Sequence, residues 1–248
     1  MLTNYHTHHY RCNHASGSIE DYVIEAIKEG YLEIGISCHV PFENFPEMGA
    51  HRMDYKNLST YLSEIDDLRE KYPQIRILKS FECEYFPKVH EYMERLAQET
   101  DYLILAGHFI EKEGKYKTSF DLTQPEELEI YATQLKIAMK TGLFEILAHP
   151  DVFMTSYPKW DNFCEQITRE IAKMANECDV VIEMNANGLR RSQAYFSREF
   201  WELIATEFPE TKVIINSDCH DPELLNDEYM KQVRQMAVDL NLNVLLKI

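Results

Sequence analysis

The chain has 248 residues, of which 45% are hydrophobic and 27% charged, a composition typical of soluble globular proteins. Its formal net charge of −17 argues against nucleic acid as a partner, because binding to phosphate backbones requires a basic surface. No apolar run approaches the ~20 residues of a membrane-spanning helix, and the first residues lack the pattern of a signal peptide. The six cysteines show no framework spacing, which favours reduced thiols and a cytoplasmic location.

The eight glycines form neither a G-x-G-x-x-G pattern nor a Walker A loop, so the usual nucleotide-binding loops are absent. An acidic protein can still accept an anionic substrate if bound metal ions supply the local positive charge. The composition therefore directs attention to residues that could hold metals.

Short β-like runs alternate along the chain with longer segments of helical periodicity, which is typical of a parallel α/β protein. Ser18 to Asp21 resembles a capping box at the start of the first helix, Gly30 is placed to end it, and Pro125 suits the first turn of a later helix. The predicted strands cover residues 2–5, 32–38, 75–81, 102–107, 144–148, 180–184 and 212–216. Helices are predicted near residues 18–30, 58–68, 89–99, 125 onward, 161–178, 198–207 and 222–240.

These seven strand–helix units follow one another without a linker, a repeat or a low-complexity segment. We therefore expect a single domain over residues 1–248, with an α/β fold of the (β/α) barrel type, for which this length is ordinary.

Histidine or carboxylate side chains follow six of the seven predicted strands. In a parallel barrel the carboxyl ends of all strands lie on one face, so these side chains should meet there. The nine candidates, in chain order, are His6, His8, His14, His39, Glu82, His108, His149, Asp218 and His220.

Alternation along a strand places His6 and His8 on the same side, as it does Asp218 and His220. The same alternation turns Cys83 and Cys219 away, so we interpret these two cysteines as packing residues. A site of imidazoles and carboxylates suits Zn, Mn or Fe.

Each of these signals has a simpler explanation when it is taken alone. An H-x-H pair is more often incidental than metal-binding, and a single polar residue at a strand end is usually a cap or a satisfied core residue. Recurrence at the same place in six units is what favours a common site. We assign no ligand role to His9, His51 and His90, and we expect Cys12, Cys38, Cys164 and Cys178 to pack or to be exposed and reduced.

The order and spacing of these residues resemble those of the PHP (polymerase and histidinol phosphatase) superfamily, and specifically its histidinol-phosphatase branch, over the whole chain. The matching pieces are His6-Thr7-His8, His14, Ser37-Cys38-His39, Phe81 to Tyr85, Gly107-His108-Phe109, Ala148 to Asp151, Glu183 to Arg190 and Ser217 to His220. The resemblance implies a distorted seven-stranded (β/α) barrel, in agreement with the count of strand–helix units.

The resemblance also implies a trinuclear site of divalent metal ions, with the third ion less regularly present. It assigns His6, His8 and Asp218 to one ion, with Glu82 bridging to a second that His108 and His149 complete. The third ion falls to His14, His39 and His220. Glu84 stands where the family often has Asp, and its role, supporting a ligand or facing solvent, is open.

The implied activity is hydrolysis of L-histidinol phosphate to L-histidinol and phosphate, a step of histidine biosynthesis. The metal ions would produce a hydroxide nucleophile from bound water and polarise the phosphoryl oxygens. Arg190 and Arg191 are the candidate phosphate-binding residues, with Arg190 favoured by the resemblance. Asp218 and His220 are candidates for proton transfer to the leaving group. Candidate substrate walls are residues 41–54, 115–124 and 153–160.

Three other interpretations remain open on the sequence. One is a PHP-type phosphatase for phosphotyrosine or another small phosphomonoester, and a second is an amidohydrolase-like metal hydrolase. A non-catalytic metal-binding module is the third, although such a protein should have lost ligands. A proofreading role in a polymerase would need further domains, for which we expect no room. The oligomeric state is not predicted.

Overall fold

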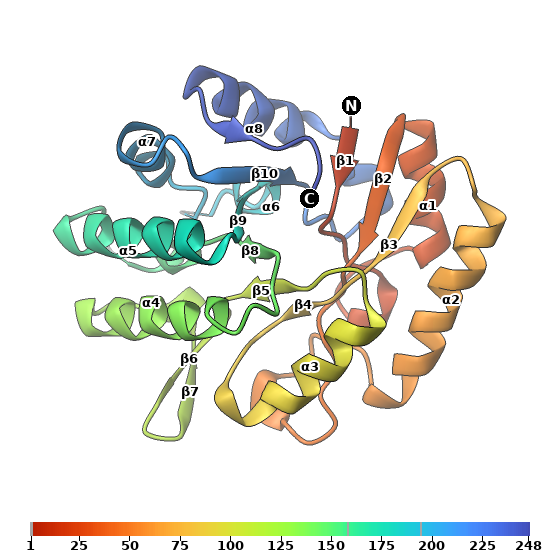
Figure 1. Cartoon of the computed structure of the whole chain (residues 1–248), viewed down its shortest axis with the longest axis horizontal. Helices are drawn as coiled ribbons and strands as arrows, with labels where there is room; N and C mark the ends of the chain where they lie inside the picture. The colour runs from red at the N-terminus through yellow and green to blue at the C-terminus, as the bar shows by residue number, and fades with distance from the viewer. Residues whose placement is uncertain (1, 158, 194) are drawn as a thin grey trace.

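In the computed structural model, which describes residues 2–157, 159–193 and 195–248, two parallel sheets surround a common interior (Figure 1). The smaller sheet has the order β1-β2-β3, and the larger has the order β11-β10-β9-β8-β5-β4. Their strands are β1 (Leu2–Asn4), β2 (Tyr31–Ile36), β3 (Arg76–Lys79), β4 (Glu82–Cys83), β5 (Ile104–Ala106), β8 (Ile146–Ala148), β9 (Val181–Asn185), β10 (Lys212–Asn216) and β11 (Asn243–Val244). The prediction of a parallel α/β fold is confirmed.

All seven predicted strands are present, but the third is divided between the two sheets. Residues 76–79 pair with β2 as β3, and after two further residues the chain joins the other sheet as β4. An isolated parallel bridge between His39 and Glu82 links the sheets at this crossing, and a second bridge between Thr7 and Cys219 links them on the opposite side. The single continuous run that we predicted over residues 75–81 is thus wrong in its last residues, because the chain changes sheet there.

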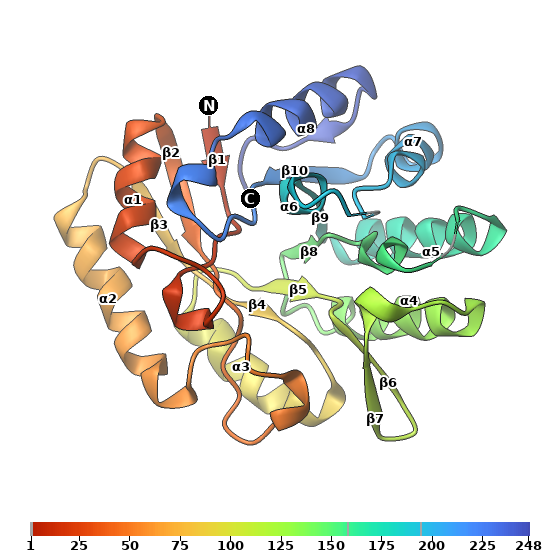
Figure 2. The same ribbon diagram turned by 180° about the vertical axis from the view of Figure 1, so that it is seen from behind.

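Apart from the short helix that follows β9, the helices lie on the outer faces of the two sheets, as both views show (Figures 1 and 2). Ser18 and Asp21 form the predicted capping box of the first helix, and Gly30 follows its end with a positive φ of 77°. Pro125 opens α4, as predicted. The helices are α1 (Ile19–Lys28), α2 (Leu58–Lys71), α3 (His90–Glu99), α4 (Pro125–Met139), α5 (Asn162–Cys178), α6 (Ala186–Arg190), α7 (Arg198–Glu207) and α8 (Glu228–Asp239).

Two elements near the carboxyl ends of the strands were not predicted. An antiparallel hairpin of β6 (Phe109–Lys112) and β7 (Lys115–Thr118) projects from the end of β5 (Figure 2). The short helix α6 directly follows β9, because Asn185 caps it by accepting a hydrogen bond from the backbone of Asn187. Both elements border the region where the strand ends meet.

The strands of the larger sheet bury side chains on both faces, as expected for parallel strands covered by helices. In β5, Ile104 and Ala106 face an inner cluster, whereas Leu105 packs in the larger cluster against the helices. The inner cluster also contains Tyr5 and Tyr102. The interior between the sheets is therefore a packed core rather than a channel.

The two sheets approach each other closely at Gly35 in β2. Tyr102 comes shortly before β5 of the larger sheet, and its hydroxyl donates a hydrogen bond to the backbone oxygen of Tyr5, which lies beside Gly35. A Cβ on residue 35 would meet that hydroxyl and would lie 2.8 Å from the Cα of Tyr5. Only glycine allows this contact between the sheets.

We predict that Gly35→Ala lowers the free energy of unfolding by about 1–3 kcal/mol, the usual effect of overpacking a buried site. Urea unfolding followed by circular dichroism would measure it. Ser59→Ala on the exposed face of α2 is the control and should change stability by less than ~0.5 kcal/mol. Equal stability of the two variants would contradict the proposed close approach.

Candidate metal centre

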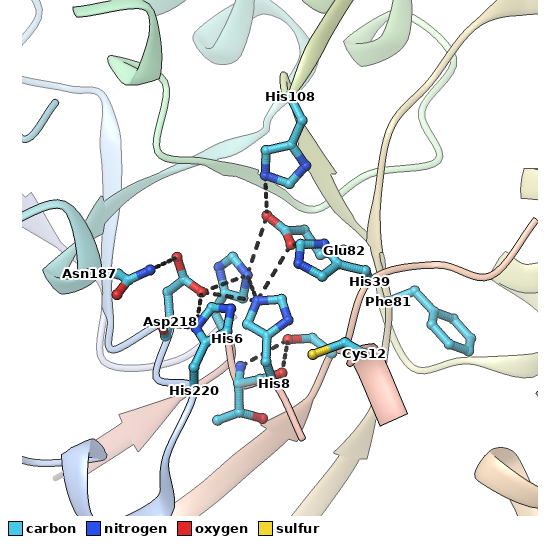
Figure 3. Close-up of polar contacts among 12 residues, drawn as sticks. His6, His8, Cys12, His39, Phe81, Glu82, His108, Asn187, Asp218 and His220 are labelled. Atoms are coloured by element: carbon cyan, nitrogen blue, oxygen red, sulfur yellow. Dashed lines mark hydrogen bonds and ion pairs between the residues drawn. The ribbon is translucent and has the colours of Figure 1, made fainter. Parts of the chain in front are cut away.

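The nine side chains predicted from the strand ends lie in one cluster at the carboxyl ends of the strands. Figure 3 shows His6, His8, His39, Glu82, His108, Asp218 and His220 of this cluster. His6 and His8 lie in the segment that follows β1, and Glu82 begins β4. Six of the nine are buried, and His14, His39 and His220 are partly exposed. The structure thus brings together every residue that the sequence singled out as a possible metal ligand.

Six of the seven histidines in this cluster meet in pairs through their Nε2 atoms. The Nε2–Nε2 distances are 3.1 Å for His6 and His8, 3.3 Å for His108 and His149, and 3.0 Å for His14 and His220. In the last pair, the Nδ1 of each ring faces a backbone oxygen, of Cys12 for His14 and of Asp218 for His220. With Nδ1 donating to those oxygens, two Nε2 lone pairs face each other, an arrangement that a shared cation stabilises.

Glu82 lies at the centre of the cluster, and its two oxygens face different histidines. Its Oε1 is 2.9 Å from Nε2 of His149 and 3.1 Å from Nε2 of His108. Its Oε2 is 2.8 Å from Nδ1 of His39 and 3.5 Å from Nε2 of His8. A carboxylate placed in this way can bridge two cations.

The donor set fits metal ions better than it fits a network of hydrogen bonds. Oε2 of Glu82, Oδ1 of Asp218 and Nδ1 of His39 are buried and have no partner of good hydrogen-bond geometry among the described residues, although they lie near other ligand atoms. Buried polar atoms of this kind are costly unless something binds them. Ligand atoms lie within 4.8 Å of one another in the groups His6–His8–Asp218, Glu82–His108–His149 and His8–His39–His220.

The first two of these groups agree with the ligand sets that the resemblance implies. The third differs from the expected set of His14, His39 and His220, because His8 takes the place of His14 in it. His14 still faces His220 at 3.0 Å, so all four imidazoles border the same space.

Burial and neighbouring charge act in opposite directions on the histidines. Burial lowers the pKa of His108, but Glu82 and Glu84 outweigh it and raise that pKa to about 10. For His39 burial dominates and lowers the pKa to about 4, despite the Glu82 carboxylate. The two rings therefore favour different protonation states at neutral pH, protonated for His108 and neutral for His39.

Glu183 on β9 is a buried carboxylate that contacts two residues of the cluster, His6 and His149. It is not among the ligands predicted from the sequence. Its Oε1 is 2.8 Å from Nδ1 of His6, and Oε2 accepts a hydrogen bond from the backbone N–H of His149. Burial raises the pKa of Glu183, but His6 outweighs it and the pKa is lowered. A carboxylate on Nδ1 fixes the His6 tautomer that leaves Nε2 free to bind a metal.

Glu84, whose role the sequence left open, is buried and supports His108. Its Oε1 lies 2.8 Å from Nδ1 of that ring, and both oxygens contact the Arg52 guanidinium at 3.1 and 3.2 Å. Although burial raises the pKa of Glu84, Arg52 and His108 hold it well below its usual value. On the other side of the cluster, Asn185 and Asn187 donate hydrogen bonds to Oδ2 of Asp218.

A cavity of about 440 Å³ opens over the cluster. The segment 41–54 contributes Met48, Gly49, His51 and Arg52 to its wall, and the segment 115–124 contributes Thr118 and Phe120. Tyr195 and Arg191 line it as well. The segment 153–160 contributes no lining residue among those described, and residue 158 lies outside the described part of the chain.

The two predicted phosphate-binding arginines occupy different positions. Arg191 lines the cavity, whereas Arg190 does not. The Arg190 guanidinium forms an ion pair with Asp227 at 2.7 Å and donates to the backbone oxygens of Ser217 and Leu224. The preference for Arg190 is therefore not supported, because its donors are already bound to the loop before α8.

The three histidines without a predicted ligand role lie at different positions in the structure. His9 is buried against the Tyr61 ring, and burial lowers its pKa to about 3. His90 begins α3 and contacts the Tyr85 hydroxyl. His51 lies on the cavity wall, with its ring centroid 4.8 Å from that of His14. None of the three belongs to a group with metal-ligand spacing in the described chain.

The fold and the cluster define an α/β protein with a histidine- and carboxylate-rich metal centre. The family model described as "PHP domain" matches residues 4–187, and the chain belongs to this family.

Named relatives differ in how much of their length the chain covers. A Deinococcus radiodurans protein named "Probable histidinol-phosphatase" is 22% identical over 160 residues, 61% of each chain. The Bacillus subtilis "DNA polymerase/3'-5' exonuclease PolX" is 24% identical over 211 residues, which cover 85% of this chain and 33% of PolX. The chain therefore spans less than two thirds of the length of either relative.

A solved structure with the same fold is that of histidinol phosphate phosphatase from Lactococcus lactis, in complex with zinc, L-histidinol and phosphate. It is 19% identical, has a TM-score of 0.74, and the match covers 98% of this chain and 95% of that one. At this identity the likeness establishes the fold.

Within the described ranges, no helix has both the length and the apolar character needed to cross a membrane.

We predict that Glu183→Gln lowers metal affinity by ~10–100-fold, because an amide holds the Nδ1 proton of His6 less strongly than a carboxylate does. Competition with a chromogenic chelator would measure the affinity. Glu33→Gln is a matched control: Glu33 is also a buried strand carboxylate, but it binds the hydroxyl of Tyr5 away from the cluster. Its metal affinity should equal that of the wild type, and a similar loss in both variants would contradict a specific role of Glu183.

Proposed function

We propose that this protein is a metal-dependent phosphomonoesterase that hydrolyses L-histidinol phosphate to L-histidinol and phosphate, as a step of histidine biosynthesis. The observation that carries the proposal is the convergence of seven imidazoles and two carboxylates below one cavity. The PHP domain and the fold shared with a histidinol phosphate phosphatase support the substrate class.

The cluster fits two to three divalent ions. His6, His8 and Asp218 would hold one ion, with Glu82 shared with a second at His108 and His149. His39, His220 and His14 would hold the third. Imidazole and carboxylate donors without a thiolate facing the cavity suit Zn, Mn or Fe.

We further propose that the two sheets form a distorted (β/α) barrel over one domain, as the sequence predicts. The bridges Thr7–Cys219 and His39–Glu82 support this, since they join the two sheets at two separate places close to the ligands. A closed arrangement would hold ligands from distant parts of the chain at fixed separations.

When bound, divalent ions would act as Lewis acids toward phosphoryl oxygens and lower the pKa of coordinated water. The protein's own residues would mainly position the substrate and neutralise the charge of its phosphate. Arg191, on the cavity wall, is placed to grip phosphate oxygens, and the apolar rings of Phe120 and Tyr195 would limit water around the ester.

Asp218 and His220 were predicted to assist proton transfer. Burial raises the pKa of Asp218, but His6 and His8 hold it well below its usual value, whereas burial and His8 lower the pKa of His220. Both groups are therefore deprotonated at neutral pH, which suits them to bind cations or accept a proton rather than to donate one.

The first test is phosphate release by metal-replete protein from histidinol phosphate, phosphotyrosine, phosphoserine and sugar phosphates, with and without a chelator. We expect preference for histidinol phosphate and complete loss of activity after chelation. Comparable weak activity on all esters would retain the phosphatase and reject the substrate. Absence of turnover with metals bound would reject the phosphatase and favour a metal-binding module.

A second prediction separates the two arginines. Arg191→Ala should lower kcat/KM by ~10–100-fold, the loss expected for one or two hydrogen bonds to a charged group, with little change in Tm. Arg190→Ala should instead lower Tm, because it leaves Asp227 without its ion-pair partner. Steady-state kinetics and thermal unfolding of both variants would decide, and the reverse pattern would restore Arg190 as the phosphate-binding residue.

A further inference from the structure

A buried sulfur lies against one of the metal-facing histidines. The sulfur atoms of Cys12 and Cys38 and one ring nitrogen of His8 lie within 4.8 Å of one another, and all three residues are buried. Figure 3 shows the Cys12 sulfur beside the His8 ring, on the side away from Asp218. Sequence reasoning had treated both cysteines only as packing or exposed residues.

This contact can be compared with the hydrogen-bond partners of the other imidazoles in the cluster. Four of the seven imidazoles have an oxygen on the nitrogen that faces away from the cluster: Glu183 for His6, Glu84 for His108, and backbone oxygens for His14 and His220. Nδ1 of His8 has no such partner of good hydrogen-bond geometry among the described residues, and Nδ1 of His149 has none either. For His8 no oxygen takes that place among the described residues, and the sulfur of Cys12 is one of two thiol sulfurs within 4.8 Å of a ring nitrogen.

The proton of His8 has two possible positions with different consequences. If it is on Nε2, which lies 2.9 Å from Oδ1 of Asp218 and 3.1 Å from Nε2 of His6, that nitrogen has no free lone pair to bind a metal. If it is on Nδ1, Nε2 is free, and the proton needs an acceptor on the far side of the ring. A sulfur atom is a weak acceptor, and the buried Cys12 sulfur lies beside the ring.

We propose that Cys12 is a positioning residue whose sulfur accepts the Nδ1 proton of His8 and thereby presents Nε2 of that ring to the metal. The inference rests on the metal site of the proposed function but not on its substrate.

The test compares Cys12→Ala, Cys12→Ser and Cys164→Ala, each as full-length protein, by Zn²⁺ competition with a chromogenic chelator and by thermal unfolding of the metal-free form. Cys164 is a matched control because it is equally buried, at the start of α5, with its sulfur near Met154 and away from the cluster. C12A should lower Zn²⁺ affinity by ~10-fold or more, the range for residues that orient a metal-bound histidine. C12S should recover most of it, since a hydroxyl oxygen is a better acceptor, and C164A should bind like the wild type.

Two results would overturn the proposal. One is equal Zn²⁺ affinity of C12A and C164A, and the other is an equal loss of affinity in C12A and C12S, which would assign the effect to lost packing volume. Since the measurement contains no substrate, a loss confined to C12A supports the role of Cys12 even if histidinol phosphate is not hydrolysed.

Discussion

The position of Glu82 is the constraint on which the site depends. Its backbone lies where the two sheets meet: its N–H donates to the backbone oxygens of Ser37 and Cys38, and its own oxygen accepts from the N–H of Val40. Its side chain contacts histidines that follow β1, β2, β5 and β8. Any shift of one sheet against the other would therefore change the ligand geometry directly. The tight contact at Gly35 adds to this constraint, because it lies beside Tyr5, the residue before His6.

The concentration of polar groups that this constraint creates is unfavourable for the metal-free protein. Two buried carboxylates and seven imidazoles exclude most solvent, while several of their atoms have no protein partner. Metal ions that bind only the folded chain would stabilise it by mass action in addition to any catalytic role. The same ions would offset, close to the cavity, a net charge of −17 that would otherwise repel a phosphate ester.

The ligands could be predicted from the sequence because strand ends in a parallel fold are recognisable and share one edge. The residues that support these ligands or bind next to them could not be predicted, and the physical reason is different for each. Glu183 lies inside a strand, where the alternation of side chains does not indicate whether a carboxylate supports a metal ligand or forms an ordinary ion pair. Arg190 depends on Asp227, which lies 37 positions later and approaches it only through the fold. Cys12 depends on the αL turn at Asn13, which ends the short 3₁₀ segment Tyr10–Cys12 between His8 and His14.

The metal ligands and the wall of the cavity come from different parts of the chain. The ligands and the groups that orient them come from strands and from the residues next to strand ends, whereas much of the wall comes from the segment 41–54 and the hairpin. These two pieces are held together by an aromatic cluster in which Phe45 contacts Phe86 and Tyr116, with the Lys88 ammonium 3.4 Å from the centroid of the Phe45 ring. The carboxylates that line the cavity, Glu82, Glu84 and Asp218, are all engaged within the cluster or with Arg52. Under the proposed function, the ammonium of histidinol phosphate would therefore meet aromatic faces and polar groups of the wall. Changes in these segments would then alter substrate choice while the metal centre stays intact.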